Sequence, residues 1–184
     1  IGGDGVLISG PGGIGKSGTA MAGIVHGLLT VGDDYVVVEP ANPPNAWPVY
    51  RLFKQDPAGV RRFPGLHRQL ARRPLNWQGK LEFDPGELSP GGMARSLRLR
   101  AILVPSIERL PRSRVEPMAR GKAIEAIARS TIVQLAGERA SIVLFCAGLA
   151  AGLPVFRLFL SEKPAEIAAT VAALLENLAG EQSR

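Results

Sequence analysis

Residues 10–17 read Gly10-Pro11-Gly12-Gly13-Ile14-Gly15-Lys16-Ser17, which completes the G-x-x-x-x-G-K-[ST] pattern of a phosphate-binding loop. The apolar run 5–9 before it predicts a strand, and residues 16–29 after it predict a helix. Glycines let the backbone take positive φ and turn successive N–H groups toward phosphate oxygens. Lys16 adds a cation, Ser17 adds a hydroxyl for Mg²⁺, and the helix adds its positive end. This context predicts nucleoside triphosphate binding, and a glycine-rich surface turn is the alternative.

Length and composition predict one domain over residues 1–184, because 184 residues of which 46% are hydrophobic suffice for one core. We expect a cytoplasmic protein without membrane contact, since no run approaches the ~18 apolar residues of a membrane span and no leader precedes the loop. The lone Cys146 lies in the apolar run 141–147, which predicts a buried thiol rather than a ligand. The chain starts without Met shortly before the loop, which is compatible with a missing N-terminal segment.

Positive charge is concentrated in one segment of the chain. The net charge is +6, and residues 51–73 hold seven basic side chains against Asp56 alone. A solvated basic face, a platform for an anionic substrate and a nucleic-acid patch are the three interpretations. Aromatic residues interleave with these charges, but no RNA-binding signature accompanies them, so we do not expect a nucleic-acid partner.

Periodicity and turn residues divide the rest of the chain. Residues 40–90 are rich in Pro, Gly, Asn and Arg and predict loops with short strands near 49–53 and 80–83. The other predicted elements are strands at 35–39, 97–104, 141–147 and 155–160, a helix at 117–136 that stops at Gly137, and a helix at 164–178 that stops at Gly180. Interleaved strands and helices predict an α/β fold.

A second chemical feature is the pair Asp33-Asp34, which follows Gly32 at the entrance to the predicted strand 35–39. A phosphate loop needs a carboxylate near its metal, and a kinase also uses a base that accepts the proton of the acceptor hydroxyl. Two adjacent carboxylates could supply both. An ordinary Gly-Asp-Asp turn is the alternative.

The order of loop, helix and Leu29-Thr30-Val31-Gly32-Asp33-Asp34-Tyr35-Val36-Val37-Val38 resembles the HPr kinase/phosphorylase group, whose core phosphoenolpyruvate carboxykinases share. The segment Leu153-Pro154-Val155-Phe156-Arg157-Leu158 and the terminal helix are similar to the HPr-kinase-like serine kinase domains that occur alone in bacterial gene clusters. The resemblance is specific over residues 5–39, moderate over 97–178 and vague between. It implies a mixed sheet flanked by helices around the loop.

The resemblance also implies an ATP-dependent kinase that phosphorylates a hydroxyl of a protein, a peptide or a small molecule. Mg²⁺ would be held by Ser17 and Asp34, while Asp33 would act as the base and Lys16 would neutralise the phosphates. The nucleotide-binding residues implied are Gly10, Pro11, Gly12, Gly13, Ile14, Gly15, Lys16, Ser17 and Gly18. A homo-oligomer is a further implication, although no heptad pattern indicates one.

The chain departs from this family at several points. Gly18 stands where relatives place Thr or Glu, and the glycine-rich segment that HPr kinases place against HPr is absent, which puts HPr itself in doubt as acceptor. Gly18 and the basic segment favour a nucleotide-binding regulatory module as the alternative, and a nucleic-acid-stimulated ATPase is a third interpretation that rests on the surplus of positive charge alone. Lys80, Arg51 and Arg109 are candidates for acceptor contacts by charge alone, and we interpret His26 as structural and His67 as a surface residue.

Overall fold

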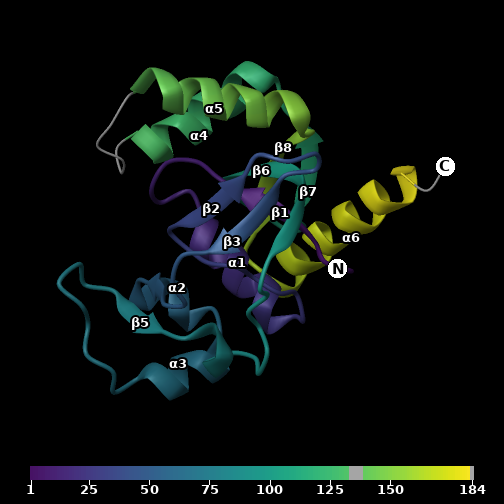
Figure 1. Ribbon diagram of the computed structural model, residues 1–184. Helices are drawn as coiled ribbons and strands as arrows, with labels where there is room; N and C mark the ends of the chain where they lie inside the picture. Colours follow the sequence, from purple (N-terminus) through teal and green to yellow (C-terminus); the bar gives the residue numbers. More distant parts are fainter. Residues whose placement is uncertain (133–138, 183–184) are drawn as a thin grey trace.

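The computed structural model describes residues 1–132 and 139–182, and a mixed sheet forms its centre (Figure 1). Its six strands are β1 (Asp4–Ile8), β2 (Val36–Glu39), β3 (Asn45–Pro48), β6 (Leu97–Leu110), β7 (Arg114–Pro117) and β8 (Val155–Ser161). The long β6 pairs in parallel with β1 and β8 and, at its first residues, antiparallel with β3. The carboxyl ends of β1, β6 and β8 therefore point the same way, toward the glycine-rich loop.

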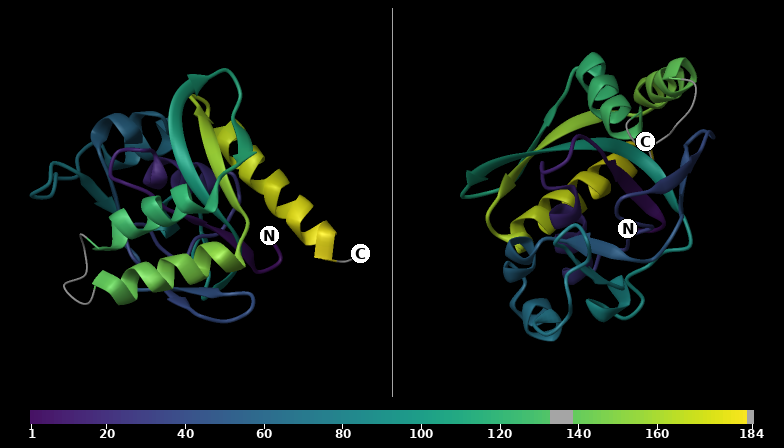
Figure 2. Two further views of the ribbon diagram at one scale, coloured as in Figure 1. Left: turned by 90° about the horizontal axis from the view of Figure 1, so that it is seen from above. Right: turned by 90° about the vertical axis from the view of Figure 1, so that its left-hand side faces the viewer.

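Helices cover both faces of this sheet (Figures 1 and 2). The helices α1 (Lys16–Val25) and α6 (Pro164–Gln182) pack on one face, and α4 (Arg120–Ile132) and α5 (Arg139–Gly152) pack on the other. Two clusters of buried side chains match these layers: one includes Met21, Leu103 and Ile167, and the other includes Leu99, Ile127 and Cys146. The predicted α/β arrangement, with a mixed sheet flanked by helices, is confirmed.

Residues 53–87 form a small unit beside the sheet. It consists of β4 (Phe53–Gln55), α2 (Pro57–Arg61), α3 (Pro64–Leu70), β5 (Leu81–Phe83) and the 3-10 turn η1 (Pro85–Glu87), and β4 pairs antiparallel with β5. The sequence predicted loops and short strands here, so the two helices were missed. Each helix begins with a proline, a residue preorganised for the first helical position. Phe53 and Phe83 are fully buried and anchor the unit.

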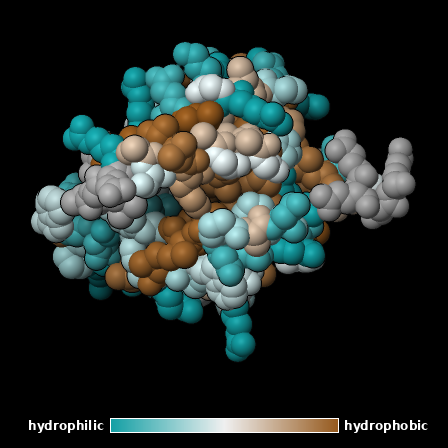
Figure 3. Space-filling model, turned by 45° about the horizontal axis from the view of Figure 1, so that its top comes forward, coloured by the Kyte–Doolittle hydropathy of each residue, from teal (hydrophilic) through white to brown (hydrophobic). Residues whose placement is uncertain are grey.

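The strand predicted at 141–147 is wrong, because these residues belong to α5. Their continuous apolar run is compatible with both a buried strand and a buried helix, and neighbouring residues extend the run to the length of a helix. Cys146 faces the core as predicted, whereas Leu144 is 73% exposed on the outer side. Figure 3 brings this side of the molecule forward and shows hydrophobic side chains gathered among hydrophilic ones.

Other boundaries differ from the prediction in smaller ways. The first helix ends at Val25 rather than 29, β6 continues to Leu110, and β7 was not predicted. The terminal helix passes Gly180, while the expected stop of α4 at Gly137 lies outside the described residues. Within the described ranges no helix has both the length and the apolar character that crossing a membrane requires.

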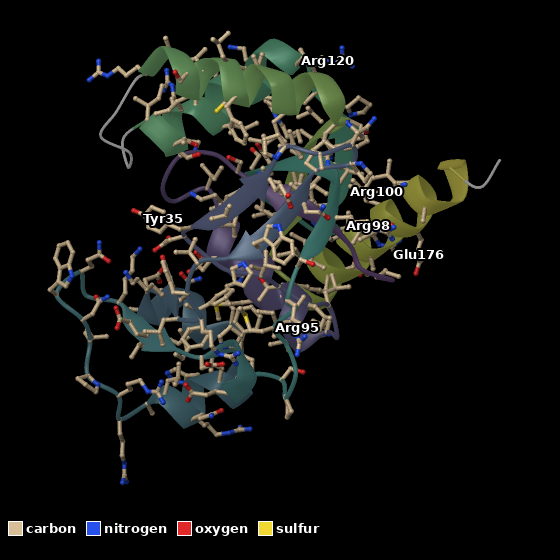
Figure 4. All side chains as sticks on the ribbon, viewed as in Figure 1. Tyr35, Arg95, Arg98, Arg100, Arg120 and Glu176 are labelled. Atoms are coloured by element: carbon tan, nitrogen blue, oxygen red, sulfur yellow. The ribbon has the colours of Figure 1, made fainter. Side chains whose placement is uncertain are left out.

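The start of β1 is held by an ion-pair cluster on β6. Asp4 lies 2.9 Å from Arg98 Nε and 3.8 Å from Arg100 Nε, and the Arg100 guanidinium donates to Leu178 O of α6 at 3.2 Å. Figure 4 shows Arg98 and Arg100 on the side of the sheet where α6 lies. Buried Arg100 thus joins β1, β6 and α6, which fixes the strand that leads into the loop.

Candidate functional site

The loop between β1 and α1 has a backbone that only glycine accepts readily. Gly10, Gly13 and Gly15 have φ of +138°, +81° and +101°. A Cβ atom on Gly15 would lie 2.5 Å from Leu160 Cδ1 of β8, so this turn also requires the absence of a side chain. The Ser9 N–H donates to Leu103 O at 2.9 Å and fastens the start of the loop to β6. The tip, at Gly12 and Gly13, is exposed.

Lys16 bends back over this loop. Its Nζ donates to Gly10 O at 2.8 Å and to Pro11 O at 2.9 Å. Burial lowers the pKa of Lys16, and the nearby carboxylates of Asp34 and Asp33 oppose that shift. Two neutral carbonyl oxygens therefore hold the ammonium group at the loop. Charged phosphate oxygens would accept stronger hydrogen bonds from it and could take the place of these carbonyls.

Asp33 lies next to Ser17, the last residue of the sequence pattern. Its carboxylate accepts hydrogen bonds from the Ser17 side chain and, at 3.1 Å, from the Lys54 backbone N–H on β4. Burial raises the pKa of Asp33, and both hydrogen bonds oppose the shift. Asp34 is exposed and acts electrostatically on Lys16. The structure thus brings together the loop, Lys16, Ser17 and both acids.

Three polar residues that sequence reasoning missed lie near this cluster. At Gly18, an added Cβ would lie 3.7 Å from both Arg62 Nη1 and Gln55 Nε2, so these two side chains border the space that a side chain at position 18 would enter. The Tyr50 hydroxyl is buried and lacks a hydrogen-bond partner among the described residues. Burial, followed by Asp34 and Asp33, raises the pKa of Tyr50 to about 12. Composition singled out Arg62 only as part of the basic segment 51–73, and no sequence signal marks Gln55 or Tyr50. Gln55 lies on β4, Arg62 follows α2, and Tyr50 lies between β3 and β4.

The residues singled out by charge separate into two groups. Lys80, directly before β5, acts electrostatically on both Lys16 and Asp33, so it belongs to the surroundings of the site. Arg51 instead donates to Asp84 through Nε at 2.8 Å and Nη2 at 3.2 Å. The side chain of Arg109 lies outside the described residues.

Part of the basic segment 51–73 has local partners. Arg73 forms a two-pronged pair with Glu87, at 2.9 and 2.7 Å, and Arg62 Nη2 donates to the carbonyls of Ser161 and Glu162. Together with Arg51, these contacts tie the small unit 53–87 internally and to the end of β8. His67 is exposed on α3, as predicted for a surface residue, and His26 is exposed at the C-terminal end of α1.

The chemistry of the donors suits Mg²⁺. Ser17 offers a hydroxyl, and Asp33 and Asp34 offer carboxylates, which are the hard oxygen ligands this ion prefers. Within the described residues no group of three or more His, Cys, Asp or Glu side chains could hold a metal by itself. Mg²⁺ in phosphate sites takes one or two carboxylates and completes its shell with phosphates and water, so the donor set fits an ion that arrives with a nucleotide.

Comparisons with known proteins add a distant likeness. No protein-family model and no curated protein matches the chain. The solved structure of the Hpr(Ser) kinase/phosphatase from Coxiella burnetii is similar, with a TM-score of 0.45 and 14% identity, over 98% of this chain and 91% of that chain. At this distance the likeness assigns no family.

Proposed function

We propose that the protein is an ATP-dependent kinase of the HPr-kinase-like type, which transfers the γ-phosphoryl group to a hydroxyl. The observation that carries the proposal is the convergence of Lys16, Ser17 and Asp33 at a glycine-rich loop between a strand and a helix. A glycine loop alone would support nucleotide binding only. A partly buried acid beside the loop adds a group suited to accept a proton.

In the proposed reaction the loop N–H groups and Lys16 bind the triphosphate, with residues 10–18 forming the cradle. Asp33 accepts the proton of the acceptor hydroxyl as the new P–O bond forms and the bond from the γ-phosphorus to the β–γ bridging oxygen breaks, releasing ADP. Asp34 and Ser17 would hold Mg²⁺, which neutralises charge on the phosphates when bound. The raised pKa of Asp33 supports its role as base, because a base works best when its pKa approaches the working pH.

The contact between Ser17 and Asp33 is also compatible with the opposite assignment, in which Asp33 binds Mg²⁺ and Asp34 accepts the proton. Titration with Mg²⁺ separates the two assignments. In the assignment proposed here, Asp34→Asn raises the Mg²⁺ concentration needed for half-maximal activity, and Asp33→Asn lowers the maximal rate at saturating Mg²⁺. The opposite pattern would reverse the roles of the two acids within the same site.

The experiment that tests the function is transfer of label from γ-labelled ATP to acceptors in an extract of producing cells, followed by mass spectrometry of the labelled species. We expect labelled product with the wild-type protein and at least about a hundredfold less with Asp33→Asn. Tight Mg²⁺-dependent ATP binding without transfer would favour a regulatory module. Hydrolysis stimulated by DNA or RNA, and suppressed by salt, would favour the nucleic-acid-stimulated ATPase.

A further inference from the structure

A cavity of about 390 Å³ runs along β1, and all five residues of that strand line it. Helices α1 and α6 form one wall, through Ala20, Gly23, Val171 and Leu175. The segment 27–33 and the sheet residues Leu97 and Leu99 form other parts of the lining. The cavity is thus bordered from both layers of the molecule, and we call it the β1 slot.

The backbone of β1 is paired along one edge only. Among the described residues its strand partner is β6, and its opposite edge has none. The Ser9 N–H bonds to Leu103 O on β6, and alternate residues of a parallel strand bond to the same neighbour. Val6 and Ile8 therefore direct their N–H and C=O groups away from β6, toward the slot.

This arrangement combines a mainly apolar lining, which also includes Lys16 and Asp33, with a row of backbone donors and acceptors. Buried backbone groups require hydrogen-bond partners, and a small apolar molecule would leave them unpaired. A polypeptide in the extended conformation supplies N–H and C=O groups at the matching repeat. The edge therefore favours a strand over a small apolar ligand.

We propose that the β1 slot binds an extended segment of a partner protein, which joins the sheet as a further strand beside β1. The slot reaches Lys16 and Asp33 of the proposed catalytic site, but the inference rests on the edge of β1 that has no strand partner among the described residues, and not on the kinase activity. Val171 and Leu175 belong to the buried cluster on the α1 and α6 face of the sheet, and Leu99 belongs to the cluster on the other face. The segment therefore needs apolar side chains on both faces, as in strands buried between two helix layers. Its length should match the five residues of β1, or about 17 Å.

The walls also determine which kind of partner fits. The segment 27–33 and the helices α1 and α6 line the slot beside the β1 edge. A single flexible strand can enter between these walls. The edge strand of another folded sheet is covered by its own helices, which would meet the walls of the slot. We therefore assign the slot to an unfolded segment of another protein rather than to β1 of a second copy.

The test uses a fluorescent peptide with a five-residue valine–isoleucine core, matched to β1 and flanked by lysines for solubility. Two control peptides carry the same side chains but are N-methylated at one or the other set of alternate residues. We expect the unmodified peptide to bind, one methylated peptide to bind at least about tenfold more weakly through loss of its backbone bonds to β1, and the other to bind nearly as well. Absence of binding, or equal binding of the two methylated peptides, would overturn the proposal.

Amide hydrogen exchange locates the binding. We expect the peptide to slow exchange at Val6 and Ile8, while Ser9, already bonded to Leu103, serves as the internal reference. Binding without new protection at Val6 and Ile8 would place the peptide elsewhere and reject the slot. Protection of both amides in the protein alone, together with a dimeric mass, would show that a second copy fills the slot and would also reject the proposal.

Discussion

Replacement of Asp33 by asparagine separates chemistry from structure at the proposed site. Asparagine has nearly the same shape, and its carbonyl oxygen can still accept from the Lys54 N–H, now found at 3.1 Å. Its amide group can donate to the Ser17 hydroxyl, so the second hydrogen bond also has a replacement. The substitution removes only the charge and the ability to accept a proton.

The effect on stability should be small, because two changes oppose each other. The variant loses charge-assisted hydrogen bonds, which contribute more to stability than neutral ones. It also loses the unfavourable desolvation of the carboxylate, which is the main cause of the raised pKa of Asp33. We expect the free energy of unfolding to change by less than about 1 kcal/mol, or roughly 2–4 °C in melting temperature for a chain of this size. Calorimetry measures this, with exposed Glu176→Gln on α6 as the control for charge removal alone.

Phosphoryl transfer, in contrast, should fall by about 10² to 10⁴, the usual contribution of a general base. That loss corresponds to roughly 2.7 to 5.4 kcal/mol in activation free energy. Single-turnover transfer from γ-labelled ATP measures it, and the Kd for ATP is determined on the same protein. A rate within tenfold of wild type, at unchanged ATP affinity, would refute the assignment of Asp33 as base.

The raised pKa of Asp33 also gives two pH dependences of opposite sense. Activity requires the carboxylate, so it should fall as pH drops through the raised pKa. Stability should change in the opposite direction. The pKa of Asp33 is higher in the folded state than in the unfolded state, so ionisation of Asp33 destabilises the fold at pH values above the folded-state pKa. This destabilisation is relieved as the pH falls toward the pKa of the unfolded state. The difference in unfolding free energy between wild type and Asp33→Asn, followed over pH, tests the sign. A difference that grows in favour of Asp33→Asn on acidification would contradict it.

Further predictions concern the loop and its surroundings. Lys16→Ala should weaken ATP binding by about tenfold to 150-fold, the range of a hydrogen bond between charged groups. Titration calorimetry measures the Kd, and an unchanged Kd would contradict this prediction. Gly15→Ala should lower stability by about 1–3 kcal/mol because of its φ of +101°, whereas Gly12→Ala, with open space around it, should change little; equal melting points would contradict this reasoning. Tyr50→Phe removes a buried hydroxyl without a partner and should leave stability unchanged or raise it by about 1 kcal/mol, and a clear loss would show that the hydroxyl is bonded.

Local sequence was enough for the elements that carry the loop. The run before Gly10 and the stretch after Gly15 predict a strand and a helix, and the structure has β1 and α1 there. The strand β8 and the helix α6 were also predicted, since each has a clear period and clear flanking signals. In these cases hydrophobic pattern and turn residues agree with the tertiary fold.

The segment 141–147 shows where this agreement ends. Its apolar residues are continuous, so neither a period of 2 nor one of 3.6 distinguishes strand from helix. Packing decided the outcome: Cys146, Leu149 and Ala150 are buried against the core from α5. A sequence without a period can be assigned only once its neighbours are known.

The electrostatic character of Asp33 depends on the same kind of remote information. Sequence places the residue at the entrance to a strand beside a turn, where most carboxylates are well solvated. The bond from the Lys54 N–H shows that β4, some twenty residues further along the chain, docks onto this carboxylate and shields it from water. The small unit 53–87, for which the sequence predicted loops and short strands, thus supplies the burial that raises the pKa of Asp33. If this unit were detached, for example by replacing buried Phe53 with alanine, the pH limit of activity should shift toward the ordinary range of an aspartate while the loop itself stays intact.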